Sequence, residues 1–258
     1  MQTPNGTQRL NHHAATILPW YEDRFLLERK GPDPAFYFEN ALNIFGGSAT
    51  NEQHRAELQT SPRVTAIREV GEETYLQIAT EEGGYTREFG YEVMEDSRAA
   101  WTAPPEVSAQ MQHDAEKLGR ILIGDPEKIT YAGSFVARID PPAMKRRPIQ
   151  VGFSIYTRPL DTREFEHIQD ILTRRNGKVT TDNVKYDGRT EFVARTDMQH
   201  ERFAWGYDHM LSMLHEDGHP KGVRIRNLET AVAALRMETA GEPTYNDIRA
   251  LGFTYKGD

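Results

Sequence analysis

Residues 45–76 read FGGSATNEQHRAELQTSPRVTAIREVGEETYL, which is a Gly-Gly pair, a polar loop and a segment with helical character. Thr60 or Ser61 is placed to cap the start of that helix. Pro62 suits the first helical position, because the N–H that proline lacks would have no intrahelical acceptor there. Apolar residues recur at helical spacing over residues 66–74, which predicts one buried face.

Glu69, Glu72 and Glu73 share another face of this helix, because they lie at positions i, i+3 and i+4. Like charges at this spacing repel by about 0.2–0.5 kcal/mol per pair. A hard divalent cation would offset the repulsion, since Mg²⁺ and Mn²⁺ take oxygen ligands and keep positions for water and phosphate. The alternative is a solvated acidic face without an ion. Arg68 can pair with Glu72 four residues later.

The segment REVGEETYL, residues 68–76, resembles the second half of the signature of the Nudix hydrolases. It has the family's arginine and its glutamates, but Tyr75 stands where the family has glycine. Gly46 and Gly47 follow an apolar run, residues 41–45, as the family's Gly-Gly pair does.

The first half of the signature fits less closely. Gly47 precedes Arg68 by 21 positions, which is longer than the family's plain pattern, so we expect an insertion in the loop before the helix. The isolated glutamate of the first half then has two candidates, Glu52 and Glu57.

The resemblance extends over residues 13–216 and implies the α/β class: a Nudix-type α/β/α sandwich around a mixed sheet. We expect the Nudix hydrolase domain at residues 1–220, with an inserted helical element at about 94–128. A C-terminal helical extension, residues 221–258, is expected to dock on the domain or on a second subunit, which leaves a homodimer open.

Apolar patterning and turn residues predict the individual elements. The expected strands are 14–18, 24–28, 41–45, 76–79, 85–93, 129–139, 149–157, 179–186, 191–194 and 201–205. The expected helices are 63–74, 106–122, 161–175, 207–214, 228–239 and 244–251. Asp187-Gly188 is typical of a hairpin turn between two of these strands.

Nudix enzymes cleave a nucleoside diphosphate linked to another group, by attack of water on one phosphorus. The resemblance implies metal-dependent hydrolysis of such a diphosphate linkage, with Glu72 and Glu73 as metal ligands. Glu69 would be a further ligand or the base that takes the proton of the water, and the sequence does not separate these roles. The carbonyl of Gly47, or less favourably that of Gly46, would complete the Mg²⁺ or Mn²⁺ shell.

Other residues are weaker members of the expected site. Arg68 would orient a glutamate. The family often adds an acidic residue from a loop before its last helix, and Glu201 is the first candidate, ahead of Glu191 and Asp197. The expected substrate-binding residues are Arg29, Phe38 and Trp205. Trp205 and either Phe36 or Phe38 could stack on a base, and core packing is the alternative.

Composition limits the function classes. The chain of 258 residues has a net charge of −8, which disfavours binding to bulk nucleic acid but not to a small nucleotide. It has no cysteine, which excludes thiolate catalysis and disulfides. No apolar run approaches a membrane span or a signal-peptide core, so no membrane partner and a cytoplasmic location are expected.

Two other functions stay open. A catalytically inactive Nudix domain could bind a nucleotide or sugar nucleotide as a sensor or regulator, which Tyr75 and the loop insertion favour. An interaction module could use residues 221–258 as its contact surface. The complete set of Arg68, Glu69, Glu72 and Glu73 favours the enzyme.

Overall fold

The fold is known from a computed structural model, which describes most of the central part of the chain. The described residues are 8–9, 12–32, 38–48, 61–74, 80–81, 84–85, 108–139, 149–185, 187–198, 200–205, 207, 232–233, 244–246 and 253–254. They form a mixed sheet with helices packed on it, so the α/β class is confirmed. Within these residues, no helix has the length and apolar character needed to cross a membrane.

The main sheet has eight strands, with the central order β10-β3-β2-β9-β8-β11, and β4 and β5 pair with β3 and β2. Its strands are β2 (His12–Tyr21), β3 (Arg24–Arg29), β4 (Leu42–Asn43), β5 (Phe45–Ser48), β8 (Thr130–Ile139), β9 (Ile149–Pro159), β10 (Arg189–Ala194) and β11 (Val232–Ala233). The pair β2 and β9 is parallel, and the other pairs of this sheet are antiparallel. Two short pairs lie outside it: β1 (Gln8–Arg9) with β12 (Phe253–Thr254), and β6 (Thr80–Glu81) with β7 (Gly84–Tyr85).

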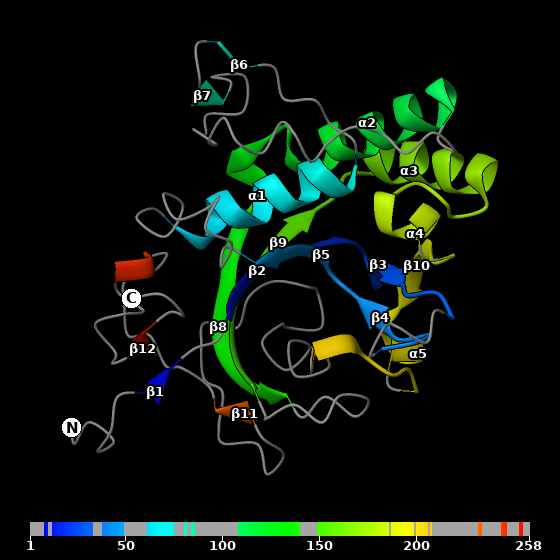
Figure 1. The fold of residues 1–258 in the computed structure, drawn as a ribbon. Helices are drawn as coiled ribbons and strands as arrows, with labels where there is room; N and C mark the ends of the chain where they lie inside the picture. Colours follow the sequence, from blue (N-terminus) through cyan, green and yellow to red (C-terminus); the bar gives the residue numbers. More distant parts are fainter. Residues whose placement is uncertain are drawn as a thin grey trace.

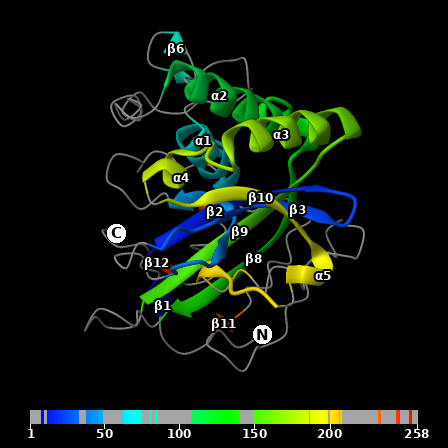
Figure 2. The ribbon, with the colours of Figure 1, turned by 90° about the vertical axis from the view of Figure 1, so that its right-hand side faces the viewer.

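The helices lie mainly on one side of this sheet. They are α1 (Pro62–Glu73), α2 (Ala109–Ile123), α3 (Thr162–Arg175), α4 (Thr181–Lys185) and α5 (Arg195–Met198), with a 3₁₀ turn η4 (Pro126–Lys128). Figures 1 and 2 both place α1, α2 and α3 over one face, with α5 on the opposite side.

Two apolar clusters fill the two faces of the sheet, because successive side chains of a strand point to opposite sides. On β2, Ala15 and Ile17 belong to the cluster that includes α1, α2 and α3, whereas Ala14 and Leu18 belong to the cluster that includes Met198 of α5. The buried stripe of α1 is the expected one, and it fixes which face of the helix is left for the glutamates.

Local signals explain where the helices begin. The α1 helix starts after Ser61 with Pro62 in its first turn, as the sequence predicts. The α3 helix has a complete capping box, in which the Asp161 side chain accepts from the Glu164 N–H and Glu164 accepts from the Asp161 N–H. The α2 helix begins after Ser108, whose hydroxyl accepts from the Met111 N–H.

The structure corrects several predicted elements. The strand expected at 179–186 is wrong, because the short helix α4 occupies this segment; Thr180 Oγ1 accepts the Asn183 N–H at 3.2 Å and so starts a helical turn. The hairpin expected at Asp187-Gly188 is wrong as well, since β10 pairs with β3. The helix expected at 228–239 is wrong at residues 232–233, which form the strand β11 along the edge of β8.

Several expectations fall outside the described residues. These are the strand 76–79, most of the strand 85–93, the helix 207–214 except Tyr207, and the loop that contains Glu52 and Glu57.

Candidate functional site

The Gly-Gly pair on β5 brings the backbone close to α1 and β2. Gly46 has a φ of +136°, and a methyl group there would meet the backbone of Ala15. A methyl group at Gly47 would overlap the carboxylate of Glu69. Glycine is therefore required at the first position by the backbone and at the second by a glutamate of the helix.

Arg68 holds two glutamates of α1 beside this strand. Its side chain is 1% exposed, and it donates to Glu69 Oε1 at 2.6 Å and to Glu72 Oε1 at 2.8 Å. It also donates to the carbonyl of Ser48, at the end of β5, at 3.3 Å. The guanidinium thus positions Glu69 and Glu72 relative to each other and to the strand that carries Gly47.

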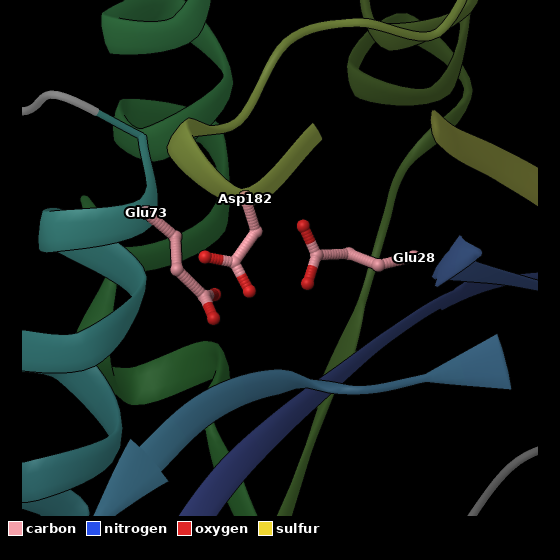
Figure 3. Close-up of side chains that lie close together, drawn as sticks. All are labelled: Glu28, Glu73 and Asp182. Atoms are coloured by element: carbon pink, nitrogen blue, oxygen red, sulfur yellow. The ribbon is translucent and has the colours of Figure 1, made fainter. Parts of the chain in front are cut away.

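Glu73 points in another direction and meets two carboxylates that the sequence did not predict. Its Oε2 accepts the N–H of Gly46 at 3.2 Å. Glu73 from α1, Glu28 from β3 and Asp182 from α4 point toward one another, and one oxygen atom from each lies within 4.8 Å of the others (Figure 3). We call Glu28, Glu73 and Asp182 the carboxylate cluster.

Polar contacts between α4 and the sheet fix the far side of this cluster. Glu28 is fully buried, and its Oε1 accepts from Thr180 Oγ1 at 2.5 Å and from Asn183 Nδ2 at 3.5 Å. Asn183 Oδ1 accepts in turn from Thr190 Oγ1 at 2.8 Å, and Thr190 lies opposite Glu28 in the β10–β3 register. These contacts place Asp182, in the first turn of α4, over the end of β3.

Lys30 supplies a positive charge to the cluster. Its Nζ lies 2.5 Å from Asp182 Oδ2 and 3.4 Å from Glu28 Oε2, and its side chain is 8% exposed. Burial alone would lower the pKa of this ammonium, but attraction by the three carboxylates outweighs burial and raises the pKa. Lys30 is therefore charged wherever the neighbouring carboxylates are.

The cluster still holds more negative than positive charge. Burial, followed by repulsion from Glu28 and Asp182, raises the pKa of Glu73 well above its usual value, and Lys30 opposes this shift without cancelling it. Oxygen donors from three elements, with a charge that one ammonium does not balance, suit Mg²⁺ or Mn²⁺. The residues present thus fit the divalent ion that the resemblance implies.

Arg29 and Glu201 lie on the opposite face of the sheet. Arg29 follows Glu28 on β3, and neighbouring residues of a strand point to opposite faces. Arg29 forms a bidentate ion pair with Glu201, at 2.8 and 2.9 Å, and donates a further hydrogen bond to Glu191 at 2.6 Å. The structure therefore does not bring Glu201, Glu191 or Arg29 to the carboxylate cluster. Asp197, the remaining candidate, is exposed on α5.

The two aromatic candidates contact each other. The ring centroids of Phe38 and Trp205 are 4.8 Å apart, with planes tilted by 55°. Trp205 packs against the apolar cluster that includes Met198 of α5, so this pair belongs with Arg29 and not with the carboxylate cluster.

Tyr207 belongs to the apolar cluster that includes Met198 of α5. It is buried, and its ring contacts Phe153 at 5.2 Å between centroids. Burial, and then the charges of Glu73 and Glu69, raise the pKa of its hydroxyl.

Sequence signals for the unpredicted members were present but weak. Glu28 is a charged residue within the apolar strand pattern RFLLER. It lies two positions after Leu26 and therefore on the same buried face of the strand. Asp182 follows Thr180, a residue typical of a helix start, but the β-branched residues around it favoured a strand.

No protein-family model matches the sequence. No curated protein matches it either. Seven chains among the solved structures match. One is a Nudix hydrolase from Alicyclobacillus acidocaldarius, which is 16% identical, with a TM-score of 0.44 over 80% of this chain and 91% of that chain.

Proposed function

We propose that this protein is a metal-dependent hydrolase that cleaves the diphosphate linkage of a nucleoside diphosphate derivative. The observation that carries the proposal is the meeting of Glu73 with Glu28 and Asp182, beside Gly46 on β5. The substrate class comes from the resemblance of residues 68–76 to the Nudix signature.

Mg²⁺ or Mn²⁺ is the proposed cofactor, and the carboxylate cluster would hold it. A bound divalent ion would stabilise the negative charge that develops on phosphate oxygens and would offset the repulsion between substrate and carboxylates. Glu28 and Asp182 replace Glu201 in this proposal, because they are the acids that lie beside Glu73.

Glu69 is the proposed base. Its side chain is 17% exposed, more than that of Glu28, so a water molecule can reach it. Its carboxylate would accept the proton as the water oxygen bonds to phosphorus and the anhydride P–O bond breaks toward the leaving phosphate. Arg68 would fix the direction of this carboxylate, and Glu72, held by the same guanidinium, is the remaining proposed ligand.

A sensor function has one structural observation in its favour. The ammonium of Lys30 already contacts two members of the carboxylate cluster, so the folded protein has a cation there without any metal. A domain that only binds a nucleotide could keep this ion pair permanently.

Formation of a nucleoside monophosphate from a panel of nucleotide sugars and dinucleotides, read by chromatography, separates the two functions. The enzyme predicts turnover with Mg²⁺ or Mn²⁺, loss of turnover with a chelator, and loss in E73Q. The matched control is E166Q, which changes an exposed glutamate on α3 and should keep full activity. Nucleotide binding that needs no metal, with no turnover of any compound in the panel, would support the sensor and refute the enzyme.

A further inference from the structure

We propose that Lys30 is a built-in competitor of the metal: its ammonium occupies the carboxylate cluster in the metal-free protein and must leave when a divalent cation binds. This inference rests on the proposed function, and it adds a regulation of metal affinity that the function alone does not require.

The position of the ammonium is the first argument. Nζ lies 2.5 Å from Asp182 Oδ2 and 3.4 Å from Glu28 Oε2, and both residues also belong to the group whose oxygens lie within 4.8 Å of one another. An ion bound by the carboxylate cluster would share the residues Asp182 and Glu28 with the ammonium. Two cations so close would repel strongly in a site shielded from water.

The attachment of Lys30 is the second argument. Its backbone N–H donates to the carbonyl of Ala41 at 2.9 Å, which fixes the main chain at the end of β3. Four methylene groups separate this fixed backbone from Nζ, and the side chain is 8% exposed. The ammonium can therefore move away by rotation of its own side chain, while Glu28 and its partners Thr180 and Asn183 stay in place.

The consequence is a lowered metal affinity. In the metal-free state, the ion pairs with Lys30 stabilise carboxylates that would otherwise repel one another without compensation. A metal must displace these ion pairs before it gains its own ligands, so removal of the ammonium should strengthen metal binding.

The test is a titration with Mn²⁺ alone, followed by electron paramagnetic resonance, on the full chain without substrate. The variants are K30M and the control K178M. Lys178 pairs with Asp187 in a salt bridge whose side chains are 45% and 70% exposed, so K178M changes the net charge equally without touching the cluster. K30M should bind Mn²⁺ at least about tenfold more tightly than wild type, equivalent to about 1.4 kcal/mol. K178M should bind within about threefold of wild type.

Equal or weaker binding by K30M than by K178M would overturn this inference while leaving the proposed function intact. Absence of Mn²⁺ binding in all three proteins would overturn both.

A second measurement uses wild type only, in case K30M does not fold. Reductive methylation, read by mass spectrometry, should modify Lys30 severalfold faster with saturating Mg²⁺ than without it, because the released ammonium reaches solvent. Lys178 is the internal control and should react at the same rate in both samples. An unchanged rate at Lys30 under Mg²⁺ saturation would overturn the inference.

Discussion

Replacement of Gly47 by alanine should disturb one glutamate of the site and leave the fold of β5 in place. A methyl group at Gly47 would overlap the carboxylate of Glu69, which is the flexible end of a side chain, so Glu69 must rotate away. The same replacement at Gly46 would push a methyl group into the Ala15 backbone at a φ of +136°, which no side-chain rotation relieves.

The size of the effect follows from what Glu69 loses. Its bond from Arg68, at 2.6 Å, joins a guanidinium that is 1% exposed to a carboxylate that is 17% exposed. Loss of a hydrogen bond between charged groups costs about 1.5–3 kcal/mol, and an off-rotamer side chain costs about 0.5–1.5 kcal/mol. We expect G47A to lower the free energy of unfolding by about 2–4.5 kcal/mol. If Glu69 is the base, kcat should fall by about two orders of magnitude or more.

A double-mutant cycle in urea isolates the cause. In an E69A background the carboxylate is absent, so G47A should cost nothing or even stabilise the protein slightly, because alanine restricts the unfolded chain more than glycine does. G46A should remain strongly destabilising in both backgrounds. If G47A lowered the unfolding free energy equally with and without Glu69, the proposed contact between the strand and the helix would be refuted.

Three further predictions concern charged groups. E73Q should abolish hydrolysis yet raise the unfolding free energy of the metal-free protein in urea, since it removes a carboxylate whose pKa burial raises; a loss of stability would contradict this. Burial would raise the pKa of Glu164, but Arg158 outweighs burial and holds this pKa at about 2 in the folded protein. As pH falls, Glu164 is therefore protonated in the unfolded chain before it is protonated in the folded protein. The stability advantage of wild type over E164Q, at most about 3 kcal/mol, should therefore be complete above pH ~5 and vanish by pH ~2, and an advantage independent of pH would argue against it. D114N should cost about 1.5–3 kcal/mol, because the buried Asp114 accepts from two arginines of α3, whereas the exposed control D170N should change unfolding by less than about 0.5 kcal/mol.

The α1 helix could be predicted because its signals are local. Pro62 in the first turn, the buried stripe and the glutamate spacing all lie within one short segment, and the structure has the helix where they place it. The capping box at Asp161 and Glu164 is another case, in which both partners lie within four residues.

The carboxylate cluster could not be predicted in the same way. Glu28 and Asp182 are separated by more than 150 positions in sequence, and they meet because β10 pairs with β3 and α4 folds over that pair. Asp182 also lies in a segment whose β-branched residues favour a strand. The segment is nevertheless a helix, because the Thr180 hydroxyl caps its first turn.

The alternating side-chain directions along β3 explain why Arg29, and Glu201 paired with it, do not lie beside the helix glutamates. Alternation alone predicts that Glu28 and Arg29 point to opposite faces, but it does not say which face α1 covers. That choice depends on the packing of α1 against the apolar cluster that includes Ile17.

The most direct test of the account compares Mn²⁺ binding by D182N and by D187N. Asp182 belongs to the carboxylate cluster, whereas Asp187 lies five positions later with a side chain that is 70% exposed. Both changes remove one negative charge, so they differ in position alone. Electron paramagnetic resonance should show that D182N weakens Mn²⁺ binding at least about tenfold while D187N binds as wild type does. Equal binding by the two variants would contradict the proposal that Glu28, Glu73 and Asp182 hold a divalent cation.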